Sequence, residues 1–207
     1  MKDEYSKKIE DFLIRDISDI NELKILEFGV RHGITTKKFL KLCEEKNGQL
    51  FSIDIDDCSS VSKSPNWTFI KSRDDNFDYI EKKIPKVFDV ILIDSFHNAK
   101  HVKKILYYYY RKLKIGGRIF IDDICWIPYV LNNYRNHFNS EMNNRETFDM
   151  INKVILSNQE NINVYFSFVG SGMAKIIKLN ENKLSNTVKI KSREFSLKNI
   201  VRKLVKR

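Results

Sequence analysis

The feature that most constrains the fold of this chain is a regular alternation of short apolar segments with amphipathic ones. Five apolar runs have the length expected of buried strands, at residues 24–28, 49–55, 67–71, 88–93 and 118–122. Between them, residues 35–45, 76–84 and 101–113 place apolar side chains at helical spacing, and we expect the last of these helices to stop at Gly116 and Gly117. Because strands that alternate with helices form right-handed crossovers, the pattern predicts a mainly parallel sheet.

Segments at both ends extend this pattern. Residues 4–17 predict an amphipathic helix before the first strand, and residues 128–138 and 145–156 predict two helices after the fifth strand. Residues 163–169 and 173–179 have the composition of two strands joined by a short glycine turn, which makes them antiparallel. We therefore predict an α/β fold with a mainly parallel seven-stranded sheet, an antiparallel edge and helices on both faces.

The positive charge is concentrated at the C-terminal end of the chain. The formal net charge is +10, and residues 181–207 contribute +7 of it through nine basic and two acidic side chains. We predict one domain over residues 1–180 and a basic, partly amphipathic tail over residues 181–207. Because the domain itself is nearly balanced, the charge is poor support for a nucleic-acid partner. The tail suits peripheral contact with an anionic membrane surface, and equally a solvated chain end.

Cysteine usage and the start of the chain bear on the compartment. Cys43, Cys58 and Cys125 are isolated and odd in number, which argues against a disulfide framework and against a zinc site. The N-terminal residues form no apolar leader, and no run of about 18 apolar residues occurs. We therefore expect a cytoplasmic protein. Its oligomeric state, including a homo-oligomer, is left open by the sequence.

The loop after the first strand has the form of a nucleoside-binding turn. In sheets of this kind, ligands bind beyond the carboxyl ends of the strands. Glu27, Gly29 and Gly33 form the pattern E-x-G-x-x-x-G, which differs from the G-x-G-x-x-G loop that seats a pyrophosphate. This spacing suits a cationic, phosphate-free nucleoside ligand, and a purely structural tight turn is the alternative. Asp54 ends the second strand about 20 residues further on, where a carboxylate can accept hydrogen bonds from ribose hydroxyls.

Acidic side chains also follow the fourth and fifth strands. Asp94 closes the fourth strand, His97 comes three residues later, and Asp122 and Asp123 close the fifth. Because these strand ends are neighbours in the predicted sheet, we expect the four side chains at one rim. Three carboxylates placed together repel one another unless they share a proton or a divalent cation.

Taken together, four segments resemble class I S-adenosylmethionine-dependent methyltransferases. They are LEFGVRHG, FSID, VILIDSFHNAKHV and LKIGGRIFIDD, and the resemblance extends over about residues 23–180. Within that class they are similar to small O-methyltransferases whose fourth strand ends in an I-D-x-x-H motif. The resemblance implies a Rossmann-like methyltransferase fold and S-adenosyl-L-methionine as cofactor.

The resemblance also implies roles for individual residues. It places Glu27, Gly29 and Gly33 around the methionine part of the cofactor, Asp54 at its ribose and Asp74 near its adenine. Asp94 matches an acid of the family that counts among both the cofactor-binding and the catalytic residues.

His97 is the second expected catalytic residue. Imidazole exchanges protons near neutral pH, so His97 is a candidate general base for an acceptor hydroxyl. Mg²⁺ held by Asp94, Asp122 and Asp123 is the alternative way to activate that hydroxyl. The family's second acid in this motif is replaced by Phe96, which removes one potential ligand and weakens the case for a metal.

The sequence therefore predicts O-methylation of a small-molecule or sugar hydroxyl. The first alternative is an RNA or other nucleic-acid methyltransferase. Against base N-methylation, the fourth strand ends Asp94-Ser95-Phe96-His97 and lacks the Asn/Asp-Pro-Pro-aromatic turn that holds an exocyclic amine. The second alternative is a non-catalytic nucleotide-binding module of the same fold. Trp126 and Tyr129, beyond the fifth strand, are candidates for the wall of an acceptor pocket, with structural packing as the alternative for Trp126.

Overall fold

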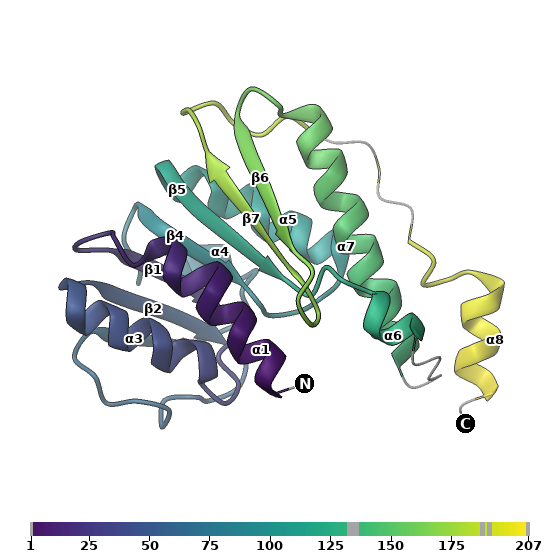
Figure 1. Cartoon of the computed structure of the whole chain (residues 1–207), viewed down its shortest axis with the longest axis horizontal. Coiled ribbons are helices and arrows are strands. Elements are labelled where there is room, and N and C mark those ends of the chain that lie inside the picture. The colour runs from purple at the N-terminus through teal and green to yellow at the C-terminus, as the bar shows by residue number, and fades with distance from the viewer. Residues whose placement is uncertain (1, 132–136, 187–188, 190–191, 206–207) are drawn as a thin grey trace.

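A computed structural model describes residues 2–131, 137–186, 189 and 192–205. It has three layers, in which helices cover both faces of one central sheet (Figure 1). The seven strands are β1 (Lys24–Phe28), β2 (Gln49–Asp54), β3 (Trp67–Lys71), β4 (Phe88–Ile93), β5 (Leu113–Asp122), β6 (Ile162–Ser167) and β7 (Met173–Lys178). The predicted fold class is confirmed.

The strand order brings the chain's carboxyl-end loops together at the middle of the sheet. The order is β3-β2-β1-β4-β5-β7-β6, with β1 to β5 parallel and β7 antiparallel to both β5 and β6. The chain runs outward in one direction from β1 and in the other from β4. The loops that follow these two strands therefore diverge, and a crevice opens between them.

Two apolar layers hold the helices on the sheet. One face is covered by α1 (Lys2–Lys8), a π-helical turn (Ile9–Ile14), α2 (Arg15–Ile17) and α3 (Ile34–Lys46). The other is covered by α4 (Phe77–Glu81), α5 (Ala99–Tyr109) with the 3₁₀ turn Tyr110–Lys112, and α7 (Phe138–Ser157). Figure 1 shows α1 and α3 on the near side of the sheet, with α4 and α5 behind it. Because both faces are covered, the central strands β1 and β4 are buried along almost their whole length and do not alternate, whereas the edge strands β3 and β6 are partly exposed.

The N-terminal helical segment is anchored along its length. Ile9, Leu13 and Ile17 are fully buried in the layer that α3 also covers. The helix predicted over residues 4–17 is present, but its middle is a π-helical turn. Such turns are uncommon and occur often at functional sites.

Two sequence predictions of element ends are wrong. Gly116 and Gly117 do not stop the helix after β4; they lie inside β5, which begins at Leu113. The pairing of β4 with β5 shifts in register, because Phe88 pairs with Leu113 whereas Val90 pairs with Arg118. β5 therefore has extra residues in this interval, and Gly116, at φ +76°, is one of them. The helix expected from residue 145 begins at Phe138, because the polar residues before 145 form the first turns of α7.

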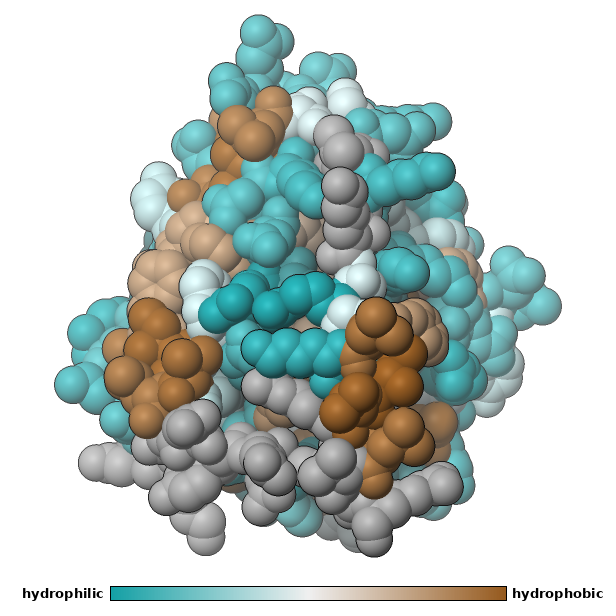
Figure 2. All heavy atoms as spheres, turned by 90° about the vertical axis from the view of Figure 1, so that its right-hand side faces the viewer, coloured by the Kyte–Doolittle hydropathy of each residue, from teal (hydrophilic) through white to brown (hydrophobic). Residues whose placement is uncertain are grey.

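The tail folds into a short helix, α8 (Leu197–Val205). Its buried Asn199 reaches the sulfur of Met142 in α7, while Leu197, Val201 and Leu204 are exposed. On the side of the molecule that carries α8, hydrophobic side chains gather in two groups with hydrophilic ones between them (Figure 2). None of the helices within the described residues has the length and apolar content needed to cross a bilayer.

Candidate functional site

A pocket of about 1200 Å³ opens at the carboxyl ends of the central strands. It is bordered by the loops after β1, β2, β3, β4 and β5, by α1, and by the turn between β6 and β7. The pocket thus lies at the point where the strand order reverses, as the sequence predicts. Its volume is more than sufficient for a nucleoside-sized ligand together with a second small molecule.

The glycine loop after β1 passes close to the end of β4. Gly29 has φ +96°, and a Cβ there would lie 2.1 Å from the carbonyl oxygen of Asp94. Gly29 therefore permits both the turn and the close approach, and it lines the pocket. Gly33, at φ +71°, precedes α3 and packs against Val61. Gly33 is not among the residues that line the pocket, so its contribution is to the turn.

Asp54 at the end of β2 holds the glycine loop in place. Its carboxylate oxygen Oδ2 accepts hydrogen bonds from the backbone N–H groups of Val30 at 2.7 Å and Arg31 at 3.0 Å. Partial burial raises the pKa of Asp54, but the backbone N–H donors outweigh it and hold that pKa below its usual value. The other oxygen, Oδ1, accepts from the backbone N–H of Asp56 at 3.0 Å, and Asp54 lines the pocket.

Glu27 is not among the residues that line the pocket, and its placement around the methionine part of the cofactor stays a prediction. Its side chain is fully buried beneath the loop, where it accepts hydrogen bonds from Thr36 Oγ1 at 2.9 Å and Ser52 Oγ at 2.6 Å. Glu27 thereby ties β1 to α3 and β2. Burial raises its pKa from 4.5 to about 7, although these hydroxyl donors oppose the shift.

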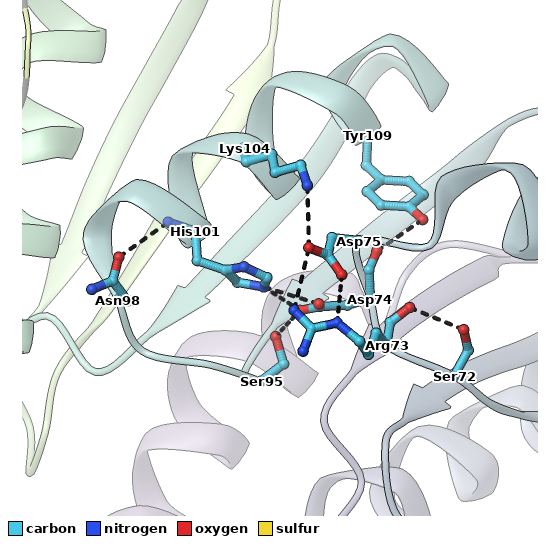
Figure 3. A network of polar contacts seen from close by, with 9 residues as sticks. All are labelled: Ser72, Arg73, Asp74, Asp75, Ser95, Asn98, His101, Lys104 and Tyr109. Atoms are coloured by element: carbon cyan, nitrogen blue, oxygen red, sulfur yellow. Dashed lines mark hydrogen bonds and ion pairs between the residues drawn. The ribbon is translucent and has the colours of Figure 1, made fainter.

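Asp74, after β3, is the centre of a polar network at another edge of the pocket (Figure 3). Its carboxylate accepts a hydrogen bond from Ser95 Oγ at 2.5 Å and lies 2.9 Å from Nε2 of His101. His101 is positioned by Asn98, whose side chain caps α5 by accepting from the His101 backbone N–H. Asp74 borders the pocket as expected, and its contact with adenine remains a prediction.

The sequence reasoning did not single out His101. The sequence feature that could have identified His101 is the helix cap at Asn98. A histidine three residues after a cap lies in the first helical turn and faces the strand ends. Figure 3 also shows that Asp75 pairs with Arg73 and Lys104. These residues surround the network from the solvent side and fix the loop after β3.

The expected catalytic residues do meet at one rim. His97 Nε2 lies 3.7 Å from Asp94 Oδ1 and 3.5 Å from Asp123 Oδ2. Asp123 has φ +59°, an uncommon value for a residue other than glycine, so the chain turns sharply after β5. All three side chains line the pocket, as does that of Asp122. The imidazole is one-third exposed, which leaves it accessible to a substrate.

Two residues of α1 complete this rim and were not predicted from the sequence. The Tyr5 hydroxyl donates to Asp94 Oδ2 at 3.2 Å and lies 2.9 Å from Thr35 Oγ1. The Lys8 ammonium forms a buried ion pair with Asp122. The sequence feature that could have identified Lys8 is its place on the apolar face of the helix, between Tyr5 and Ile9.

Clustering of acids shapes the electrostatics of the rim. Burial, and then the charges of Asp122 and Asp123, raise the pKa of Asp94 well above its usual value, while Lys8 and Tyr5 oppose the shift. Burial also raises the pKa of Asp122, with the Lys8 charge as the main opposing influence. A positive charge that enters the pocket therefore stabilises the ionised acids.

The three predicted metal ligands are not arranged as a metal site. Asp122 is engaged by the Lys8 ammonium, and His97 lies against Asp94 and Asp123. Within the described part of the chain, no three or more His, Cys, Asp or Glu side chains converge as ligands of a metal ion. The donor set as it stands does not fit Mg²⁺, because the Lys8 ammonium already engages Asp122.

The acceptor side of the pocket is only partly described. Tyr129, in α6 (Ile127–Leu131), lines the pocket. Trp126 instead packs against Phe148 of α7, with ring centroids 5.3 Å apart, and stacks with Arg145. Residues 132–136, which follow α6, are not among the described residues.

Comparison with a family profile identifies the part of the chain that carries this site. The profile Methyltransf_24, described as a methyltransferase domain, matches residues 26–124, from β1 to just past β5. The curated proteins compared with the chain include no significant match.

Solved structures of methyltransferases share the fold. MycE, a methyltransferase from the mycinamycin biosynthetic pathway solved with Mg and SAH, is 19% identical with a TM-score of 0.63, covering 91% of this chain and 56% of that one. PaMTH1 from Podospora anserina, solved with SAH, is 15% identical with a TM-score of 0.64, covering 86% and 87%. The plantazolicin methyltransferase BamL, also solved with SAH, is 20% identical with a TM-score of 0.62, covering 84% and 85%. The chain spans little more than half the length of MycE.

Proposed function

We propose that this chain, whose residues 26–124 match a methyltransferase-domain profile, uses S-adenosylmethionine to methylate a hydroxyl oxygen of a small molecule or a sugar. The observation that carries the proposal is the position of His97. Its imidazole lies between two carboxylates at the rim of a pocket whose other borders are a glycine loop and the Asp54 carboxylate. A base and a nucleoside-binding loop thus open into the same space.

The residues present fit the cofactor. The glycine loop borders the pocket at Gly29, whose missing side chain lets the loop pass against the carbonyl oxygen of Asp94. Asp54 would accept hydrogen bonds from ribose hydroxyls, and Asp74 borders the pocket on the side predicted for adenine. The acids that line the pocket favour a cationic ligand over a dinucleotide phosphate. When bound, the cofactor supplies a methyl group that its sulfonium has already activated.

The protein's own task is then alignment and proton removal. Transfer would require the pocket to hold the acceptor hydroxyl opposite the methyl group of the bound cofactor. Nε2 of His97 takes the proton of the acceptor hydroxyl as the new O–C bond forms and the C–S bond breaks. Asp94 and Asp123, each within 4 Å of that nitrogen, stabilise the imidazolium that results.

The two alternative functions have less support from the site. A nucleic-acid acceptor would have to approach a rim of carboxylates, which repel phosphates. A non-catalytic nucleotide-binding module gives no reason for an exposed imidazole between two carboxylates. Methyl transfer only to RNA would support the first alternative, and cofactor binding without methyl transfer would support the second.

Cofactor binding is tested first, by isothermal titration calorimetry with S-adenosylhomocysteine and with NAD. We expect binding of S-adenosylhomocysteine and a rise in melting temperature that depends on its concentration. Asp54→Asn should weaken binding, whereas Asp57→Asn, which changes an exposed acid of the same loop, should not. Binding of NAD alone would overturn the cofactor assignment.

The acceptor is tested by incubating the protein with S-adenosylmethionine and classes of hydroxyl-bearing acceptors. Products are read by mass spectrometry for methyl gain and by NMR for the atom that carries it. We expect the methyl group on oxygen, and His97→Gln should abolish its appearance while S-adenosylhomocysteine still binds. A methyl group on nitrogen, or transfer only to RNA, would contradict the proposal.

A further inference from the structure

The N-terminal helix delivers a buried positive charge to the acidic rim. The Lys8 side chain is 1% exposed, although lysine is seldom fully buried without a partner. Its ammonium donates to Asp122, to Ser171 Oγ at 2.9 Å and to the carbonyl oxygen of Gly172 at 3.4 Å. An ammonium has three N–H donors, so all three find partners here.

The surrounding structure fixes this ammonium in place. Ile9, the next residue, is fully buried in the core, so Lys8 cannot swing outward unless the helix moves. On the opposite side, the carbonyl oxygen of Gly172 also accepts from the backbone N–H of Asp123 at 3.1 Å. A Cβ on Gly172 would lie 2.7 Å from that of Cys125, so the β6–β7 turn packs tightly on the segment after β5.

The position of this charge coincides with that of the predicted metal ligands. Asp122 is bound directly, Asp94 is held through Tyr5 of the same helix, and Asp123 shares the Gly172 carbonyl oxygen with Lys8. A divalent cation on Asp122 would lie within a few ångströms of the ammonium. At about 4 Å two such charges repel each other strongly in a partly buried site.

We propose that Lys8 is the resident cation of the rim formed by Asp94, Asp122 and Asp123, and that it takes the place a divalent metal would otherwise occupy. Lys8 is a positioning residue in this proposal. It neutralises Asp122 and leaves Asp94 and Asp123 to hold the imidazole of His97. The inference rests on the proposed function for its link to methyl transfer, but its metal-binding consequence can be measured without any acceptor.

The first test measures Mn²⁺ binding by electron paramagnetic resonance, in the full chain and in three variants. Lys8→Met removes the charge and keeps the length of the side chain, Lys8→Arg keeps the charge, and Lys7→Met changes the exposed neighbour. We expect saturable Mn²⁺ binding in Lys8→Met only, because three carboxylates are then left without a cation. Saturable binding of Mn²⁺ to the unaltered protein at these carboxylates would overturn the proposal, whether or not Lys8→Met folds.

The second test compares kcat with and without EDTA once an acceptor is known. The unaltered protein should keep its kcat in EDTA, and Lys8→Met should lose about tenfold or more. Lys8→Arg should recover much of the loss, and added Mg²⁺ should restore part of it in Lys8→Met alone. Loss of activity of the unaltered protein in EDTA would refute the proposal.

The two proposals fail in different ways. If S-adenosylhomocysteine does not bind but the Mn²⁺ results are as expected, the proposed function is wrong and Lys8 is still the cation of the rim. If S-adenosylhomocysteine binds and the unaltered protein also binds Mn²⁺ at these carboxylates, the proposed function is retained and the proposed role of Lys8 is wrong.

Discussion

The imidazole of His97 lies 3.7 Å from the carboxylate of Asp94, which closes the strand next to the glycine loop. Asp94 also accepts from Tyr5, and its carbonyl oxygen lies where a Cβ on Gly29 would otherwise be. Asp94 therefore connects the proposed base, the N-terminal helix and the glycine loop. Changes at His97 and Asp94 should accordingly affect catalysis and binding to different degrees.

His97→Gln should lower kcat about 100-fold or more, because proton removal by a positioned base contributes at least that factor. The affinity for S-adenosylhomocysteine should not change, since His97 borders the acceptor side. Asp94→Asn should lower kcat and also weaken cofactor binding. Single-turnover kinetics and calorimetry separate the two effects, and equal losses of affinity in both variants would assign His97 to the cofactor.

Asp54→Asn should weaken S-adenosylhomocysteine binding about 10- to 100-fold, the range for hydrogen bonds to a charged group. The amide of asparagine keeps one acceptor for the loop N–H groups but loses the charge and an acceptor pair. Asp57→Asn is the matched control, because Asp57 is exposed and does not border the pocket. Calorimetry that found equal affinities for both variants would remove Asp54 from the site.

The fold was accessible from the sequence because its pattern is local and repeats. Apolar strands that end in acids predict that Asp54, Asp94 and Asp122 lie at one edge of the sheet. Residues whose position depends on long-range packing were missed. Lys8 lies 114 residues from Asp122 along the chain, and only the packing of α1 brings them together.

The surroundings of Glu27 also do not follow from the sequence pattern. A strand residue points to one face of the sheet or the other, and the sequence pattern does not show which polar side chains lie on that face. Thr36 and Ser52 bind this carboxylate inside the protein. The glycines inside β5 were misread because a bulge and a helix stop share the same residue type.

Gly29→Ala should destabilise the fold far more than Gly116→Ala. Both glycines have positive φ, +96° and +76°, so each alanine incurs about 1–2 kcal/mol of backbone strain. Only at Gly29 does the new methyl group collide with backbone, 2.1 Å from the Asp94 carbonyl oxygen, while nothing lies within 4 Å at Gly116. Urea denaturation measures the difference, and similar midpoints for the two variants would contradict the close approach of β1 and β4.

The tail should bind anionic bilayers through α8. Leu197 and Leu204 are 82% and 65% exposed, and the +7 charge of residues 181–207 complements anionic lipid. Co-sedimentation with phosphatidylserine vesicles should exceed that with phosphatidylcholine vesicles. Leu197→Ser combined with Leu204→Ser should reduce it about tenfold or more. Leu156→Ser, at an exposed leucine of α7, is the control. Vesicle binding that depends neither on lipid charge nor on Leu197 and Leu204 would contradict this role for the tail.

Glu27 should make stability depend on pH in a defined window. Its pKa is raised from 4.5 to about 7 in the folded protein. Between these values the native state binds more protons at Glu27 than the unfolded chain does, so the free energy of unfolding falls as pH rises through the window. At about 1.4 kcal/mol per pH unit the loss approaches about 3 kcal/mol, and it is complete above pH 7.

Glu27→Gln tests this dependence, because the amide has nearly the same shape, can still accept from Thr36 and Ser52, and does not titrate. The variant should match the unaltered protein near pH 4.5 and exceed it in stability near pH 8. Urea denaturation across this range, without cofactor, gives the two curves. Parallel curves would mean that Glu27 is ionised in the folded protein throughout, with its charge satisfied by the two hydroxyl groups that donate to it.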